Sequence, residues 1–517
     1  MRMRELSRGA ALVALLVSGA PAFAADLPIL AAPPIDAFGG NFFGRLYHAY
    51  ADEWGKDAPV ADASAAPLPP ARRGLDQIAP QPETSPPYPF GEWPFGGAST
   101  IGGAIPNAVD TPLQKALLPA SSAPGKWLED QHIQVYGWVT LGANVSTAKN
   151  GYGGNAPAAY SYSPNQAMLD QAVVYIERVP DTVQQSHWDW GFRVSGIYGE
   201  NYRYTTAYGL FSNQYVIHNH FEGYDMPMVY GELYLPQFAE GLLLRAGRYI
   251  SVPDIEAQLA PNNYMYSHSM TYAVDNYTNT GLVGTLKINK NWLAQLEVSD
   301  GTETMPWNAK SVSLPNGYVG QRDPGTQPTV SACLQYQTDS ANDNFYGCAN
   351  GINKGNWGYN NLQWFGGTIY HKFNEQWHIA FESYYEYQKG VNSSLAGPGL
   401  TGTPFQYMAN APFLAQCPNG ETSCTAGEYS ALAYLNYRID SMNNFSLRGE
   451  FYNDERGQRT GFATRYVNEA IGWQHWFSPS IEMRPEIAWY HSLDQAAFDN
   501  GTKHEVVIVS SDLTWHF

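Results

Sequence analysis

The chain has 517 residues, a formal net charge of −18 and only 15% charged residues, whereas 14% of its residues are aromatic. This acidic composition, rich in Tyr and Gly, excludes a coiled coil and a basic nucleic-acid-binding protein. The mean hydropathy of −0.35 excludes a bundle of membrane helices, but it permits strands in which apolar and uncharged polar residues alternate.

Residues 1–24 are predicted to be a secretory signal. Arg2 and Arg4 give a basic start, a short apolar run follows, and Ala22-Phe23-Ala24 forms a small-residue cleavage site. We therefore expect export and cleavage before Ala25. An uncleaved anchor is the weaker alternative, because the apolar run is short for a bilayer. No later stretch is apolar enough to predict a membrane helix.

Residues 25–125 are rich in Pro, Ala and Gly, as in segments 66–70 and 85–89. Such a composition cannot build a packed core, so we expect a mostly extended periplasmic arm. Within it, residues 42–54 are predicted to form one short amphipathic helix. That helix could dock on a surface or be inserted into a pore, but a solvated helix is the favoured prediction.

From about Gln131 onward, apolar and polar residues alternate with a period of two. Val135 and Val139 fall on one face of the first segment, and Gln134 and Thr140 fall on the other. Such alternation indicates half-buried strands. About fourteen strands are predicted, within a range of about 12–16, at residues 131–146, 169–178, 187–198, 226–236, 241–250, 278–288, 291–300, 358–373, 375–388, 428–438, 444–453, 464–477, 480–491 and 503–517.

The links between these strands alternate in length. Short links such as 289–290 and 478–479 alternate with long ones, which are 199–225, 251–277, 301–357 and 389–427. Short turns at one end and long loops at the other are typical of outer-membrane barrels, and a soluble β-sandwich would not show this rhythm. The predicted fold class is all-β: a transmembrane antiparallel β-barrel over residues 126–517, closed because lipid leaves no backbone group unsatisfied.

The last predicted strand ends in Phe517, with Trp515 and Leu513 on the same face. This pattern resembles the C-terminal signal of outer-membrane barrels. It predicts the barrel-assembly machinery as a partner, and the outer membrane of a Gram-negative bacterium as the location.

Four cysteines form two close pairs, Cys333 with Cys348 and Cys417 with Cys424. In an exported chain these pairs predict two local disulfides, which we expect to staple loops rather than a core. Neither pair has the spacing of a zinc site. The segment His218-x-His220-x-Glu222 could grip a metal, but its loop position disfavours that interpretation. No metal site and no cofactor are predicted.

Several segments resemble the OmpL-like family of β-barrel porins. They are Gly223-Tyr224-Asp225-Met226-Pro227, residues 230–236, residues 241–248, residues 260–269 and Thr280-Gly281, with residues 85–90 of the arm similar to some members. The resemblance covers most of residues 130–517. It implies an outer-membrane channel, leaves the solute open, and carries over no catalytic residue.

The alternation predicts which charged side chains face the lumen. These pore-lining candidates are Asp189, Arg193, Glu232, Arg245, Lys287, Glu297, Glu382, Glu386, Arg438, Arg448, Glu450, Glu482, Arg484, Glu486 and Asp512. They could set a transverse field for passing solutes, or pair across neighbouring strands and brace the wall. Residues 251–277 or 301–357 could fold inward as a constriction, with Asp254, Glu256 and Asp275 as candidates in the first.

The predicted function is passive diffusion of small hydrophilic solutes, with a preference for cations or neutral solutes because of the acidic excess. The chain has no G-x-S-x-G or H-E-x-x-H motif, so an outer-membrane hydrolase is the weaker alternative. A plugged structural or adhesive barrel is the other alternative. A tyrosine-rich loop with Tyr202, Tyr204, Tyr208 and Tyr215 could stack on sugars. The expected partners are outer-membrane lipid and small solutes, not nucleic acid, and the pattern is compatible with an oligomer.

Overall fold

The computed structural model describes residues 41–54, 101, 112–117 and 123–517, the last range with gaps. The gaps are 152, 217, 219, 251–253, 276, 308–311, 314–321, 324, 341, 359–360, 394–413, 441 and 479. The predicted signal at 1–24 and most of the predicted arm at 25–125 lie outside the described residues.

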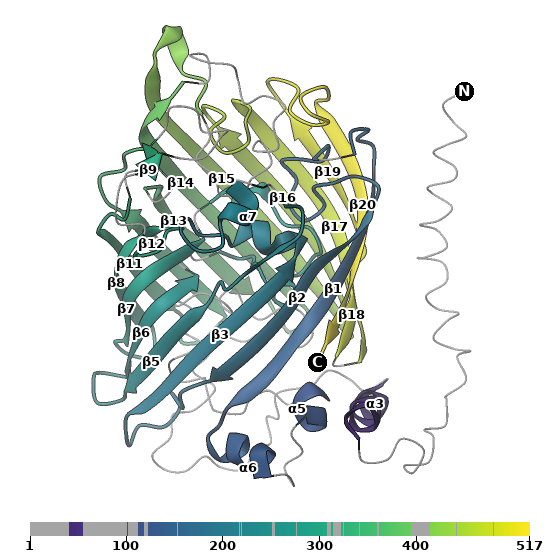
Figure 1. Ribbon diagram of the computed structural model, residues 1–517, viewed down its shortest axis with the longest axis vertical. Coiled ribbons are helices and arrows are strands. Elements are labelled where there is room, and N and C mark those ends of the chain that lie inside the picture. The colour runs from purple at the N-terminus through teal and green to yellow at the C-terminus, as the bar shows by residue number, and fades with distance from the viewer. Residues whose placement is uncertain are drawn as a thin grey trace, which may run out of the picture.

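The predicted amphipathic helix is present as α3 (Phe42–Glu53), with Asn41 capping it by accepting a hydrogen bond from the Gly44 amide. It lies against the end of the barrel where the C-terminus is found (Figure 1). There the Tyr50 hydroxyl donates to the His516 carbonyl over 2.7 Å, and Trp54 stacks on Phe477. The helix is therefore docked on the barrel, and the favoured prediction of a solvated helix is wrong.

Four other α-helices are described: α5 (Pro112–Leu117), α6 (Ala123–Asp130), α7 (Asn213–Val216) and α8 (Met270–Val274). Three 3₁₀-helices cover Glu200–Tyr204, Ala260–Asn262 and Pro418–Gly420. In the described part of the chain, no helix has the length and apolar character needed to cross a membrane.

One antiparallel sheet closes on itself, because β1 pairs with both β2 and β20. The strands of this sheet are β1 (Gln134–Ser146), β2 (Ala167–Arg178), β3 (Asp189–Gly199), β4 (Gly223–Asp225), β5 (Val229–Leu235), β6 (Leu242–Ile250), β7 (Thr278–Lys287), β8 (Trp292–Thr302), β11 (Thr329–Gln337), β12 (Asp343–Ile352), β13 (Gln363–Lys372), β14 (Trp377–Asn392), β15 (Ser423–Asp440), β16 (Asn443–Asp454), β17 (Thr464–Ser478), β18 (Ile481–Met483), β19 (Glu486–Ser492) and β20 (Glu505–His516). A separate hairpin pairs β9 (Val312–Ser313) with β10 (Arg322–Asp323).

The closed sheet has sixteen positions around its circumference in the described residues. The segments β4 and β5 share β3 as a neighbour, and β18 and β19 share β17, so each pair occupies one position. Pro227 lies in the first interruption and Pro485 in the second. Proline has no amide hydrogen to donate to a ladder, which explains why both strands break there.

The estimate of fourteen strands is therefore two short, although sixteen is the upper end of the predicted range. The two missed strands, β11 and β12, lie inside residues 301–357, which the sequence analysis treats as a loop. Val330 and Leu334 of β11 face outward and are exposed, so the alternation is present in that strand and the sequence analysis overlooks it, whereas Gly347 and Ala349 weaken the alternation in β12. The rhythm of short and long links otherwise holds around the barrel.

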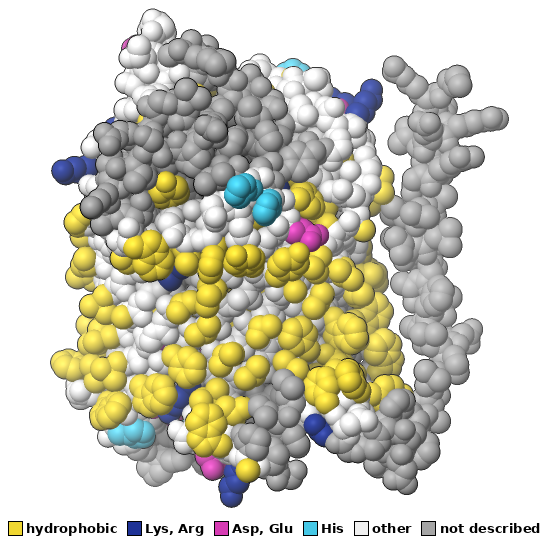
Figure 2. Space-filling view, in the orientation of Figure 1, with side chains coloured by type: hydrophobic (Ala, Val, Ile, Leu, Met, Phe, Trp, Pro, Cys, Tyr) yellow, Lys and Arg dark blue, Asp and Glu magenta, His cyan; other side chains and the backbone are white. Residues whose placement is uncertain are grey.

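The outer surface carries apolar side chains, as the yellow band in Figure 2 shows. Leu296, Val298 and Trp515 are each more than half exposed. In β8 and β20, which carry them, exposed or half-buried residues alternate with buried ones. A belt of this kind suits lipid, and the closed ladder leaves no strand edge in contact with it.

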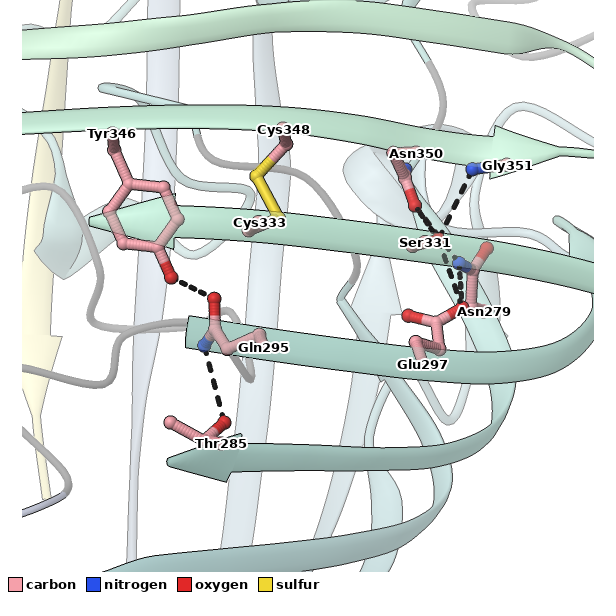
Figure 3. Close-up of a disulfide and its surroundings, with 10 residues drawn as sticks. All are labelled: Asn279, Thr285, Gln295, Glu297, Ser331, Cys333, Tyr346, Cys348, Asn350 and Gly351. Carbon is pink, nitrogen blue, oxygen red and sulfur yellow. Dashed lines mark hydrogen bonds between the residues drawn. A yellow bond between two sulfur atoms is a disulfide. The ribbon is translucent and has the colours of Figure 1, made fainter. Parts of the chain in front are cut away.

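Both cysteine pairs form disulfides. Cys333 and Cys348 are register partners on β11 and β12, so this disulfide joins two wall strands and faces the lumen (Figure 3). The expectation that both disulfides staple loops is wrong for this pair, because the hairpin that carries it is part of the wall. The Cys417–Cys424 disulfide joins a loop to the start of β15.

Candidate functional site

The lumen is the candidate site, and its wall carries ion pairs between neighbouring strands. Arg193 on β3 and Glu177 on β2 are register partners, and their side chains meet at 2.6 Å. Arg245 on β6 and Glu232 on β5 are also partners and meet at 2.6 Å. Side chains of opposite charge on register partners stabilise the pairing of the two strands that carry them.

Further ion pairs lie where strands break or end. Arg248 binds Asp225 through two hydrogen bonds of 2.9 and 3.0 Å, next to the interruption at Pro227. Arg484, next to Pro485, pairs with Asp512 of β20 at 2.5 Å. Both pairs are buried, so each charged group has lost its hydration and needs the opposite charge of its partner to compensate.

None of the fifteen pore-lining candidates is exposed at the molecular surface. Twelve of them are buried: Asp189, Arg245, Lys287, Glu297, Glu382, Glu386, Arg448, Glu450, Glu482, Arg484, Glu486 and Asp512. Arg193, Glu232 and Arg438 are half-buried. Arg438 lies near the end of β15, away from the inner loop described next.

The link between β6 and β7 folds into the barrel. We call its described residues, 254–275, the inward loop. The wall holds it through several strands: Glu382 of β14 accepts from the Ile255 amide at 2.9 Å, and Glu486 of β19 accepts from the Ser267 amide at 2.9 Å. Of the two segments predicted as an inward constriction, 251–277 is the one that enters the lumen, while 301–357 supplies β11 and β12 to the wall.

Two arginines and a glutamate of the wall hold the middle of the inward loop. Arg448 donates to the Ser267 carbonyl at 2.7 Å, and Arg484 donates to the Asn263 carbonyl at 3.1 Å. Glu450 accepts from the Thr271 amide at 2.6 Å and from the Thr271 hydroxyl at 2.7 Å. These charged candidates therefore position a loop as well as lining the wall.

The predicted constriction residues Asp254, Glu256 and Asp275 are all buried in the inward loop. Glu256 faces Arg448 at 3.6 Å and accepts a hydrogen bond from the Tyr434 hydroxyl. Burial raises the pKa of Asp275, and the nearby carboxylates Glu386 and Glu382 raise it further. Burial also raises the pKa of Asp254, and Asp275 is the next largest cause.

Aromatic rings pack the inward loop against its neighbours. Tyr160 stacks on His268 with ring centroids 3.6 Å apart, and Tyr204 stacks on the same tyrosine at 4.6 Å. Burial lowers the pKa of His268 well below its usual value, so this ring is neutral and its Nε2 can donate to the Ala257 carbonyl at 2.6 Å. The lumen is consequently narrowed by a packed loop.

The tyrosine-rich segment is not an exposed stacking platform. Tyr202 and Tyr204 are buried, and Tyr208 is half-buried. The side chain of Tyr215 lies outside the described residues. His218 and His220 are exposed with stacked rings, and Glu222 instead accepts from the Tyr198 hydroxyl at 3.2 Å. In the described residues, these three do not gather as a group of metal ligands.

The sequence analysis misses several buried charged residues, including Glu177 of β2, Arg248, Arg459 and Glu428. Arg248 has the outward parity of β6 but is buried, where it binds Asp225, and it follows Gly247, whose φ of 137° is a value that side chains rarely allow. Arg459 lies in the link after β16, where no period applies. Glu428 on β15 shares the parity of Arg438 and could have been found by the same rule.

The model of the family described as "Putative beta-barrel porin-2, OmpL-like" matches residues 132–517. The chain belongs to this family. As a β-barrel porin, it is an outer-membrane channel of the kind found in Gram-negative bacteria.

Comparison with solved structures finds other porins. The porin is similar to an anion-selective porin from Comamonas acidovorans, with 7% identity, a TM-score of 0.45, and coverage of 74% of this chain and 99% of that chain. It is also similar to the outer membrane channel DcaP of Acinetobacter baumannii, with 9% identity, a TM-score of 0.44, and coverage of 74% and 97%. A search of curated proteins found no match.

Proposed function

We propose that this porin allows small hydrophilic solutes to diffuse passively across the outer membrane, with a preference for cations and neutral solutes over anions. The polar inner wall supports passage of hydrophilic solutes, because water and polar groups can replace the hydration of a solute along it. The inward loop narrows the route and favours small solutes.

The charge balance of the lumen carries the proposed preference. Wall arginines such as Arg193, Arg245 and Arg484 each have a carboxylate partner within 2.6 Å. In contrast, Glu386 and Glu428 are neighbours that share a single nearby guanidinium, that of Arg459, which lies 4.0 Å from Glu386. Two carboxylates beside one arginine leave an acidic excess, which in a narrow, low-dielectric passage attracts cations and repels anions.

A second candidate function is a plugged structural barrel, and one observation favours it. Tyr264, Met265 and Tyr266 of the inward loop are all buried within the lumen. A loop packed this tightly could stop solutes. A measurable current through the purified protein separates the two functions, because a plugged barrel would insert into a bilayer without conducting.

The test of the proposed preference is the reversal potential of the porin in planar bilayers under a salt gradient. We expect a potential of the sign that indicates cation preference, reduced in the double variant E386Q/E428Q. The matched control is E505Q, because the Glu505 side chain is 64% exposed at the start of β20, outside the lumen. Anion preference in the wild type, or equal potentials for all three proteins, would contradict the proposal.

A further inference from the structure

We propose that Asp254, Asp275 and Glu382 form a binding site for a divalent cation, best matched by Ca²⁺. Each contributes a carboxylate oxygen, and these oxygens all lie within 4.8 Å of one another. Asp254 and Asp275 lie at the two ends of the inward loop, while Glu382 projects from β14. The site therefore joins both ends of the loop to the wall, and it does not depend on which solutes the porin passes.

The hydrogen bonding of these carboxylates points to a further ligand. Asp275 is 1% exposed, yet neither of its carboxylate oxygens has a hydrogen-bond partner. One oxygen each of Asp254 and Glu382 is also without a partner, although the other oxygen of Glu382 accepts from the Ile255 amide. Buried carboxylate oxygens normally accept hydrogen bonds or bind cations. The oxygens at this site are unusual, because they face one another without such a partner.

Among the residues that the structure describes, no arginine forms an ion pair with Asp254, Asp275 or Glu382, unlike the paired carboxylates elsewhere in the lumen. Arg459 contacts the same end of the loop, but its guanidinium donates to the backbone carbonyls of Val274 and Asp275. It also approaches Glu386 at 4.0 Å. The main electrostatic neighbours of Asp275 are Glu386 and Glu382, which are themselves acidic. A divalent cation would neutralise most of the charge that burial disfavours.

The ligand chemistry favours Ca²⁺ over other cations. Oxygen-only ligands suit hard cations such as Ca²⁺ and Mg²⁺. Ca²⁺ also tolerates the irregular geometry that ligands from a loop and a strand provide.

The experiment is calorimetric titration of CaCl₂, and separately MgCl₂, into full-length folded porin that has been stripped with a chelator. We expect one Ca²⁺ to bind per chain, about tenfold or more tighter than Mg²⁺. The isosteric variants D275N and E382Q should weaken Ca²⁺ binding at least about tenfold. Ca²⁺ should also raise the melting temperature of the wild type but not of these variants.

The matched control is E450Q. Glu450 is a buried wall carboxylate that also contacts the inward loop, through Met270 and Thr271, but it is not part of the site. E450Q should keep wild-type Ca²⁺ affinity. If D275N does not fold, as judged by circular dichroism, D254N serves in its place.

Two results would overturn the proposal. The first is the absence of saturable Ca²⁺ binding to the wild type, or binding that D275N and E382Q leave unchanged, which would indicate surface sites only. The second concerns the melting temperature. If Ca²⁺ leaves the melting temperature of the stripped wild type unchanged, and D275N melts at a higher temperature than the wild type, the carboxyl groups share protons instead of binding a cation.

Discussion

At the scale of single residues, the lumen depends on buried charges whose partners are supplied by another strand. Arg484 binds Asp512 of β20 and two carbonyls of the inward loop, Ala260 and Asn263. A buried ion pair need not make the fold more stable than two apolar residues at the same positions would. Removing one partner nevertheless destabilises the fold, because the other charge is left buried and unpaired.

We predict that R484Q lowers the free energy of unfolding by about 3–5 kcal/mol, because Asp512 loses its counter-charge. Urea unfolding of the purified porin in detergent measures this change. The control is R465Q, because the Arg465–Asp494 pair is exposed to solvent and its loss should change the free energy of unfolding far less. Equal losses for the two variants would show that burial does not govern these pairs.

A second prediction at this scale concerns Glu200, which follows β3 in a 3₁₀-helix. Burial raises its pKa to about 7; Arg203 lowers it and Glu222 raises it. The folded protein therefore holds a proton there that the unfolded chain releases near its ordinary pKa of 4.5. The resulting stability is fully present below pH 4.5 and is lost as the pH rises through 7.

The variant E200Q has no proton to lose, so it removes this contribution. Between pH 4.5 and 7.5, the wild type should lose up to about 3 kcal/mol of unfolding free energy relative to E200Q. Unfolding curves across this pH range measure the difference. A difference that stays constant with pH would mean that the Glu200 carboxyl has an ordinary pKa.

At the scale of elements, the β11–β12 hairpin shows what a disulfide does inside a barrel wall. Cys333 and Cys348 lie opposite each other, and polar side chains continue the contacts on either side of them. Ser331 donates to Asn350 at 2.6 Å, and Tyr346 bonds to Gln295 of β8 (Figure 3). The disulfide and these polar contacts therefore join β11 and β12 on their inner face, while Leu334 and Phe345 are exposed on the outer face.

We predict that C333A/C348A lowers the free energy of unfolding by about 3 kcal/mol, as expected for a disulfide that closes a loop of 15 residues. Amide hydrogen exchange should speed up in β11 and β12. The control C417A/C424A opens a loop at β15 and should leave exchange in β11 and β12 unchanged. Unaltered exchange in C333A/C348A would show that the ladder alone holds the hairpin.

These elements also show how far the sequence can be interpreted alone. The period of two locates strands wherever the two faces differ, and it places the charged side chains on the lumen side. It is weakened in β12, where Gly347 and Ala349 face outward, and it does not predict the burial of Arg248, which has the outward parity of β6. The contacts of the inward loop could not be predicted, because Asp254, Asp275 and Glu382 become neighbours only when the barrel closes.

At the scale of the whole molecule, closure creates two environments from one alternating pattern. The ladder from β1 to β20 satisfies the backbone groups of the wall, so the outside can carry Leu296 and Trp515 while the inside carries charge. The inward loop then sets the free cross-section. It is attached to strands on several sides, through Glu382 of β14, Glu450 of β16 and Glu486 of β19.

The most direct test of this account is single-channel recording of the purified porin in planar bilayers. We compare the wild type with a variant in which residues 255–272 are replaced by a short Gly-Ser linker, after checking by circular dichroism that both are folded. The account predicts discrete current steps for the wild type and larger steps for the variant, because the loop occupies the lumen. Folded protein that inserts without current in both forms, or steps of equal size, would contradict it.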